Sequence, residues 1–272
     1  MPSRRSGWRI VCACWLSCLS LAAAADSLDD GSAARTLPAI ALIIDDLGNQ
    51  RSPGRLAVSL PGPVACAFLP NAPFTRELAG RAHAGRKEVM LHLPMQALEN
   101  EARKAEPGEL TLDMTLGQFR ATIAQDIAAV PHVSGLNNHQ GSLLTRHPGN
   151  MAWLMQAISE HGNLFFVDSR TTSATVARQL AHEYDIPNSE RNVFLDNEAK
   201  PDAVRAKFRE LVRMARRDGT ALGIGHPNPA TLGVLVEELN NLGDHGVQLI
   251  PVARLIELQN NRQLAWQASS SR

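Results

Sequence analysis

The stretch Ala-Leu-Ile-Ile-Asp-Asp-Leu-Gly-Asn, residues 41–49, decides how the rest of the sequence is interpreted. Its apolar run ends abruptly on two adjacent carboxylates, Asp45 and Asp46. Such a run is typical of a strand that is buried on both faces, as in a parallel sheet. A carboxylate pair at the end of a buried strand is costly unless a cation or hydrogen-bond donors compensate for the lost water. The stretch therefore favours a cation site, and the alternative is a turn with Gly48 and Asn49 in which both carboxylates accept backbone hydrogen bonds.

Short apolar runs recur along the rest of the chain. The runs that we expect to be strands are 39–44, 64–69, 88–93, 133–137, 164–167, 192–195, 221–224 and 247–250. Segments of helical character separate them, so the pattern is one of repeated strand and helix. This alternation predicts an α/β fold with seven or eight parallel strands and helices outside, either closed as a barrel or left open and doubly wound.

The expected helices have both the periodicity and the start signals of helices. Apolar residues repeat at helical spacing in 151–158, 204–212 and 232–239. Thr115 stands three residues before a glutamine, which is a capping-box pattern, and Asn228 stands before a proline that suits the first turn. These helices are expected to cover the sheet.

The size and charge of the chain limit its class. It has 272 residues, of which 44% are hydrophobic, enough for one sizeable core. We therefore expect one domain over 39–258, followed by a frayed C-terminal tail over 259–272. Lysine plus arginine and aspartate plus glutamate both number 27, so no net charge draws the protein to nucleic acid or to an anionic membrane.

Residues 1–25 have the three-part order of a secretory signal peptide. Three arginines precede an apolar stretch over 10–21, and an alanine run over 22–25 offers a cleavage site. The alternatives are a membrane anchor and a lipoprotein attached through Cys18, but about 12 apolar residues are fewer than the ~20 that span a bilayer. We expect a periplasmic or secreted protein with a polar linker over 26–38 and no transmembrane segment after the signal peptide is removed.

Cys66 is the only cysteine outside the expected signal peptide. It lies in the apolar run 64–69, which predicts a small buried core residue rather than a nucleophile or a metal ligand. The mature chain is therefore expected to have no intrachain disulfide, so its stability must come from the packed core.

Unusual polar residues stand at the ends of the expected strands. In chain order they are Asp45 and Asp46, His92, Asn138 and His139, Asp168 and Arg170, and His226. The carboxyl ends of parallel strands share one edge in a barrel and in an open sheet alike, so these side chains should face one mouth. A carboxylate and two imidazoles form a ligand set that suits zinc and leaves positions open for water and substrate.

Several of these residues also have a purely structural interpretation. His92, which stands between apolar residues, could be a core histidine, and His226 could pack in a turn between a strand and a helix. Asp168 and Arg170 could form a structural ion pair, or they could orient catalytic groups and substrate. The residue types alone leave these alternatives open.

Five segments resemble the successive motifs of the divergent polysaccharide deacetylase family. They are 43–49 (Ile-Ile-Asp-Asp-Leu-Gly-Asn), 91–95 (Leu-His-Leu-Pro-Met), 137–142 (Asn-Asn-His-Gln-Gly-Ser), 166–172 (Phe-Val-Asp-Ser-Arg-Thr-Thr) and 223–227 (Gly-Ile-Gly-His-Pro). The resemblance spans about residues 39 to 256 and implies a single-domain distorted (β/α) barrel with a divalent metal at its carboxyl face. It also implies that Asp45 is the general base, Asp46 a metal ligand and His226 the general acid.

The chain departs from the wider superfamily in one respect. The better-known polysaccharide deacetylases carry two metal-binding histidines a few residues apart, whereas His92 and His139 stand at the ends of different expected strands. Their assignment as metal ligands beside Asp46 therefore follows from their strand-end positions.

The resulting hypothesis is an exported, metal-dependent hydrolase that removes N-acetyl groups from a cell-envelope or extracellular glycan. Asp46, His92 and His139 would hold the metal, with zinc as the first choice. Asp45 would take a proton from water, and His226 would protonate the leaving amine.

Four further residues are expected to contact substrate or to orient the site, namely Asn138, Ser142, Asp168 and Arg170. Arg170 could hold Asp45 in its ionised form. One alternative to the hydrolase is a non-catalytic periplasmic glycan-binding or scaffold protein on the same barrel. The other is a glycoside hydrolase, in which Asp168 would be the second of two carboxylates. The sequence names no protein partner.

Overall fold

The computed structural model describes residues 37–98 and 105–270. The expected signal peptide over 1–25 and nearly all of the expected linker over 26–38 lie outside the described residues. No helix among the described residues is long and apolar enough to cross a membrane.

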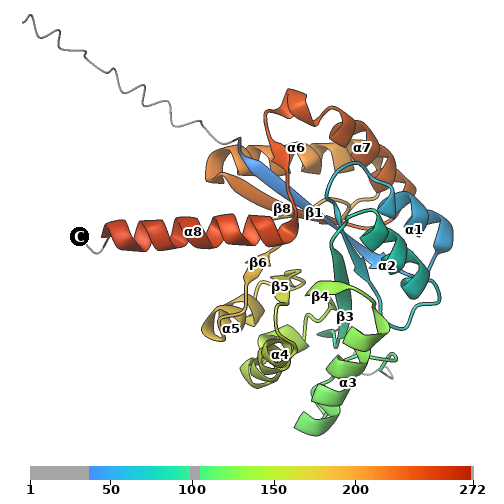
Figure 1. Ribbon diagram of the computed structural model, residues 1–272, viewed down its shortest axis with the longest axis vertical. Helices are drawn as coiled ribbons and strands as arrows, with labels where there is room; N and C mark the ends of the chain where they lie inside the picture. Colours follow the sequence, from blue (N-terminus) through green and yellow to red (C-terminus); the bar gives the residue numbers. More distant parts are fainter. Residues whose placement is uncertain (1–36, 99–104, 271–272) are drawn as a thin grey trace, which may run out of the picture. The chain divides into compact units, whose positions relative to one another are not determined.

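The described residues form one parallel sheet of nine strands that is flanked by helices (Figure 1). The strands are β1 Ala39–Leu47, β2 Ala65–Phe68, β3 Val89–Met95, β4 Val133–Gln140, β5 Phe165–Asp168, β6 Asn188–Glu190, β7 Val193–Phe194, β8 Thr220–Gly225 and β9 Gln248–Leu249. Their order is β6-β5-β4-β3-β2-β1-β8-β7, and β9 pairs with the first two residues of β1. Because β6 and β7 are the two ends of this order, the expected distorted barrel is an open half-barrel.

Helices follow most strands, as the alternation predicts. They are α1 Arg51–Val58, α2 Thr75–Ala84, α3 Leu116–Ala129, α4 Pro148–His161, α5 Ala177–Glu183, α6 Pro201–Asp218, α7 Pro229–Asn240 and α8 Val252–Ser270. The capping box of Thr115 is present at the start of α3, and the Asn228 side chain caps α7 with a proline in its first turn. The start signals of these two helices are therefore confirmed.

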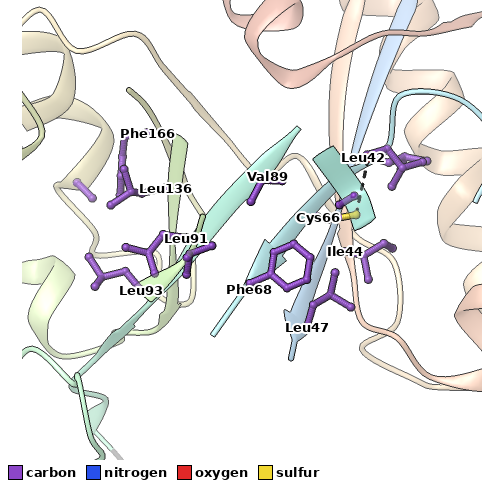
Figure 2. Close-up of a cluster of buried hydrophobic side chains, with 14 of the residues drawn as sticks. Leu42, Ile44, Leu47, Cys66, Phe68, Val89, Leu91, Leu93, Leu136 and Phe166 are labelled. Atoms are coloured by element: carbon purple, nitrogen blue, oxygen red, sulfur yellow. Dashed lines mark hydrogen bonds between the residues drawn. The ribbon is translucent and has the colours of Figure 1, made fainter. Parts of the chain in front are cut away.

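The outer face of the sheet carries the larger core cluster. In β1 the outward side chains are Ile40, Leu42 and Ile44, which alternate with inward ones. Figure 2 shows this outer cluster continuing across β2 to β5, where Cys66 and Phe68 are fully buried. The expectation that Cys66 is a core residue is confirmed, and burial raises the pKa of its thiol to about 12.

The inner face of the sheet encloses a second, smaller cluster. Inward residues such as Ile43, Met90 and Leu222 belong to one cluster with Leu255 and Ile256 of α8, which fill the barrel toward the amino ends of the strands. Each such side chain contributes roughly 1.5–3 kcal/mol when fully buried. The Glu88 carboxylate holds the first turn of α8 in place, since it accepts hydrogen bonds from the first two backbone N–H groups of that helix.

Two elements differ from the sequence-based expectation. The strand β6 was not expected, because Asn-Ser-Glu is short and polar and carries no strand pattern. Residues 259–270, expected to be a frayed tail, continue α8 to Ser270. The Arg262 side chain anchors this part of α8 by donating a hydrogen bond to the backbone oxygen of Asp218. In Figure 1, α8 extends away from the sheet beside β6 and α5.

Candidate metal centre

A bulge in β1 brings Asp45 and Asp46 to the same mouth. The pairing with β2 shifts between Ile44 and Leu47, and Asp46 has a φ of 56°. Without the bulge, neighbouring side chains would point to opposite faces of the sheet. Aspartate is among the residues that tolerate this left-handed conformation best. Gly48 follows with a φ of 113°, where a Cβ atom would also collide with the Thr75 side chain.

The histidines reach this mouth from strands on one side of β1. His92 lies on β3 and His139 on β4, and the two strands pair in register so that His92 is opposite Asn137. His92 follows the inward residue Met90 by two positions, so its ring also points inward. Asp46, His92 and His139 thereby form a cluster of candidate ligand atoms that all lie within 4.8 Å of one another.

The three closest ligand atoms form a small triangle. Oδ1 of Asp46 lies 2.9 Å from Nδ1 of His139 and 3.2 Å from Nε2 of His92, and the two nitrogens are 3.2 Å apart. Ligand atoms about 2.0–2.2 Å from zinc at tetrahedral angles lie roughly 3.4 Å apart. Oδ1 of Asp46 is also buried without a well-formed hydrogen bond. The three residues therefore fit a divalent cation.

The charges in the cluster also favour a cation. Burial would raise the pKa of Asp46, but the imidazoles of His139 and His92 outweigh burial and hold that pKa below its usual range. Burial would lower the pKa of His92, but Asp45 and Asp46 raise it to about 9. The two carboxylates thus favour a positive charge beside them, such as that of a bound cation.

Asn137 connects the candidate base to the candidate ligands. Its side-chain nitrogen donates to Oδ1 of Asp45 at 2.8 Å, and its side-chain oxygen lies 3.0 Å from Nδ1 of His92. With this oxygen as acceptor, the proton of neutral His92 lies on Nδ1 and the Nε2 lone pair faces Asp46. Asn137 therefore fixes both the orientation of Asp45 and the tautomer of His92.

Asp45 is buried beside the cluster and does not belong to its triangle of ligand atoms. Burial raises the pKa of the Asp45 carboxyl, although His92, His226 and Asn137 act in the opposite direction. A carboxyl with a raised pKa is a stronger base than one in water. Asp45 is thus suited to accept a proton from a water molecule at the mouth.

His226 directly follows β8, faces the cluster and is held by a partner that the sequence analysis missed. Its Nδ1 lies 3.0 Å from Oδ1 of Asp196, and its Nε2 lies 3.7 Å from Oδ2 of Asp46. Burial would lower the pKa of His226, but Asp196, Asp45 and Asp46 raise it. Asp196 also accepts from Thr231 and from the backbone N–H of His226, so it is fixed as an acceptor. The proton on Nε2 of a charged His226 is therefore the one available to a bound molecule.

One cavity of about 410 Å³ collects most of the predicted residues. Those that line it are Asp45, Asp46, His92, Asn138, His139, Arg170 and His226. The side chain of Asn138 accepts from the backbone N–H of Ser169 and so ties β4 to the segment after β5. The cavity lies at the carboxyl ends of the strands, where the sequence predicts the site.

Three of the residues expected to contact substrate or to orient the site have partners that the sequence did not show. Asp168 does not line this cavity, because its carboxylate accepts hydrogen bonds from the backbone N–H of Arg170 and from Thr175. Ser142 does not line it either, since its hydroxyl accepts from the backbone N–H of Leu98. Arg170 lies at the cavity wall, but its guanidinium pairs with Glu190 and not with Asp45.

Two more residues at the mouth have no counterpart in the sequence analysis. Arg191 donates to the backbone oxygens of Ser169 and Arg170 and stacks 4.9 Å from the ring of Phe194. Phe194 in turn packs edge-on against the ring of His226. Asp196 had a signal that could have been used, because it directly follows the strand run 192–195 as Asp45 follows 39–44.

Comparisons with known proteins agree with this geometry. Residues 42–256 match the family described as divergent polysaccharide deacetylase. The uncharacterized protein YibQ of Escherichia coli (strain K12) is 34% identical over 203 residues, which are 75% of this chain and 63% of YibQ. The chain therefore spans less than two thirds of the length of that relative.

Solved structures share the fold at low sequence identity. The uncharacterized protein ATU2773 of Agrobacterium tumefaciens C58 has a TM-score of 0.78 at 19% identity, covering 82% of this chain and 90% of that one. The peptidoglycan deacetylase PdaC of Bacillus subtilis has a TM-score of 0.53 at 10% identity, covering 86% of this chain and 97% of that one. The family match extends from β1 to α8 and includes every residue of the candidate metal cluster. This chain belongs to the divergent polysaccharide deacetylase family.

Proposed function

We propose that the protein is a metal-dependent hydrolase that removes N-acetyl groups from a glycan of the cell envelope. The observation that carries this proposal is the meeting of three kinds of group in one cavity. A ligand triad of Asp46, His92 and His139 lies between a buried carboxylate, Asp45, and a histidine with a raised pKa, His226. Metal-assisted amide hydrolysis combines a Lewis acid, a base and an acid in one site.

The chemistry assigns one task to each group. Asp46, His92 and His139 would hold a divalent cation, which would acidify water and polarise the carbonyl of the acetamide. Asp45 accepts a proton as the water oxygen adds to the carbonyl carbon, and Asn137 holds the Asp45 carboxylate in place. His226 gives its Nε2 proton to the amide nitrogen as the carbon–nitrogen bond breaks, which yields acetate and a free amine.

The charged partner of His226 supports this division. An acid must be protonated before the reaction, and the Asp196 carboxylate stabilises the imidazolium through Nδ1. Zinc suits a ligand set of one carboxylate and two imidazoles, so it is the ion that we propose.

The position of Asp168 disfavours glycoside hydrolysis. That reaction needs two carboxylates that face each other across the scissile bond. The carboxylate of Asp168 lies outside the cavity and is engaged by the backbone N–H of Arg170 and by Thr175. We also propose that residues 1–25 direct the protein to the periplasm or out of the cell, where envelope glycans are found.

The proposal is tested by acetate release from N-acetylated envelope glycans by the zinc-loaded protein. Because a general base and a general acid each contribute ~10²–10⁴ in rate, Asp45→Asn and His226→Ala should each lower kcat by that factor while bound zinc is retained. The control is Ser142→Ala, a site outside the cavity, which should keep kcat within a few-fold. A zinc-loaded wild type that binds these glycans without releasing acetate would leave the non-catalytic glycan-binding alternative in place of the hydrolase.

A further inference from the structure

A second cavity lies where the half-barrel is open. The chain crosses from one end of the sheet to the other at Arg191 and Asn192, whose backbone N–H groups donate to Asp168 on β5 and to Leu222 on β8. Since β7 pairs only with residues 223 and 224 of β8, the start of β8 has no strand partner on that side among the described residues. A cavity of about 610 Å³ lies there, between β5, β6 and α5 on one side and β8 and α8 on the other.

This second cavity adjoins both the candidate metal centre and a third cavity. Arg170 lines both the metal-centre cavity and the second cavity. The third, of about 230 Å³, shares His182, Asn188, Asn260 and Gln263 with the second. We call the second and third cavities together the seam trough. It leads from the wall of the metal centre toward the outer half of α8.

The seam trough is lined by charged side chains of both signs, namely Arg170, Arg178, Arg262, Asp168, Asp185, Glu190 and Asp218. Arg170 and Arg178 both pair with Glu190, at 3.3 Å and 3.0 Å. Arg262 donates to the backbone oxygen of Asp218, whose carboxylate pairs with Arg217. The seam trough therefore has no strong excess of one charge with which to select an ionic ligand.

Neutral polar groups are the ones left available. The side chains of Ser173, His182, Asn260 and Gln263 line the seam trough and have no hydrogen bond to any residue that the structure describes. Hydroxyl, carboxamide and imidazole groups can each donate and accept. A ligand rich in neutral hydroxyl and amide groups matches this set, because each of its groups also does both.

An exposed tryptophan extends the same face of α8. Arg262 and Gln263 line the seam trough, and Trp266 follows them by four and three positions, which places it on the same side of the helix. Its side chain is 70% exposed, whereas Trp153 packs against Phe119. A large, rigid ring beside a polar trough offers a flat apolar surface on which the face of a sugar can lie.

We infer that the seam trough binds successive sugar units of the glycan chain whose N-acetyl group enters the metal centre. This inference rests on the proposed function, and it assigns a place to the part of the substrate that does not react. Both cavities fall within or near the ~300–1,000 Å³ that bound organic ligands occupy, so together they hold more than one sugar. Binding of remote units would raise the occupancy of long chains over short ones.

The test compares short and long glycans. Calorimetric titration with a disaccharide and an octasaccharide of N-acetylglucosamine is carried out on zinc-loaded Asp45→Asn protein, which binds without turnover. The octasaccharide should bind at least tenfold more tightly, and adding Trp266→Ala with Gln263→Ala should remove that advantage while the disaccharide Kd stays unchanged. The matched control is Leu56→Ala, a side chain on α1 that is 60% exposed and lies away from the seam trough. Both variants alter exposed side chains, so the fold should persist, and circular dichroism checks it.

The outcomes separate this inference from the proposed function. Equal affinity for the two glycans would contradict the inference that the seam trough binds sugar units. So would an octasaccharide advantage that persists in the double variant. Acetate release by wild type in that case would still support the hydrolase. A length-dependent affinity that the double variant removes, without acetate release by wild type, would support the seam trough and remove the hydrolase. Displacement of the octasaccharide by a free envelope peptide would identify the occupant as a peptide and overturn the sugar assignment.

Discussion

The two ends of the barrel interior use the same strands and the same alternation, yet they have opposite chemistry. At the amino ends, inward residues such as Ile43 and Met90 pack on Leu255 of α8. One inward position further along the same strands stand Asp45 and His92. The difference teaches that the strand alternation alone places Asp45 and His92 in the site, whereas Asp46 also needs the bulge in β1. Along each of these strands, two positions separate a side chain of the hydrophobic core from a side chain of the candidate site.

What covers each end explains the contrast. The amino end is closed by α8, and burial there stabilises the fold. The carboxyl end opens into the metal-centre cavity, where buried carboxylates and imidazoles lower stability unless they are paired or bound to a cation. If this division is correct, substitutions at the two ends should affect different measurements.

The largest effect is expected from the ligands at the carboxyl end. Asp46→Ala, His92→Ala and His139→Ala should each abolish bound zinc and with it turnover, because each removes one member of the candidate ligand triad found among the described residues. Elemental analysis of the purified variants measures this. Met90→Leu, two positions before His92 and inside the amino-end cluster, is the matched control and should keep its zinc. Full zinc content in all three ligand variants would show that the carboxyl end of the barrel does not bind zinc through this triad.

The next effect concerns stability at the amino end. Leu255→Ala should lower the free energy of unfolding by about 2–5 kcal/mol, as expected for a fully buried leucine whose removal leaves a void. Urea unfolding gives the value, and zinc content and kcat of the folded fraction should not change. Leu264→Ala on the same helix, where the side chain is 63% exposed, should cost far less. Equal destabilisation by both substitutions would show that α8 does not plug the barrel.

A smaller and more specific effect is expected at Asp196. Its carboxylate raises the pKa of His226, so Asp196→Asn should lower that pKa and let His226 lose its proton at a lower pH. The alkaline limb of the pH–rate profile should therefore move to lower pH, with kcat reduced about 10–100-fold. Asp168→Asn, which removes another buried strand-end carboxylate, should leave that limb in place. An unmoved limb in Asp196→Asn would exclude the Asp196–His226 pair as the acid.

The parallel strands and the convergence of Asp45, Asp46, His92, His139 and His226 could be predicted from the sequence. Apolar runs that end on polar residues predict both features, because the carboxyl ends of parallel strands share one edge of the sheet. The bulge at Asp46 could not be read from the sequence with the same ease, since it depends on where β1 pairs with β2. Without it, the two carboxylates would be assigned to opposite faces.

What the sequence did not show is which groups some of these side chains contact. Arg170 pairs with Glu190 on β6, a strand that the polar sequence Asn-Ser-Glu concealed. The carboxylate of Asp168 accepts a hydrogen bond from the backbone N–H of Arg170, two residues later. A bond to the backbone leaves no sign in the pattern of side-chain types. Asn137 stands beside two residues that the prediction used, but only the register of β3 and β4 shows that it joins Asp45 to His92.

The bulge in β1 also bears on how such a site is gained and lost. Leu47 already faces outward with Ile44, so the strand holds one residue more than its pairing requires. Loss of the single codon for Asp46 would restore a regular strand and remove a candidate metal ligand at the same time. Three nucleotides thus separate a strand with the full candidate ligand triad from a regular strand without it.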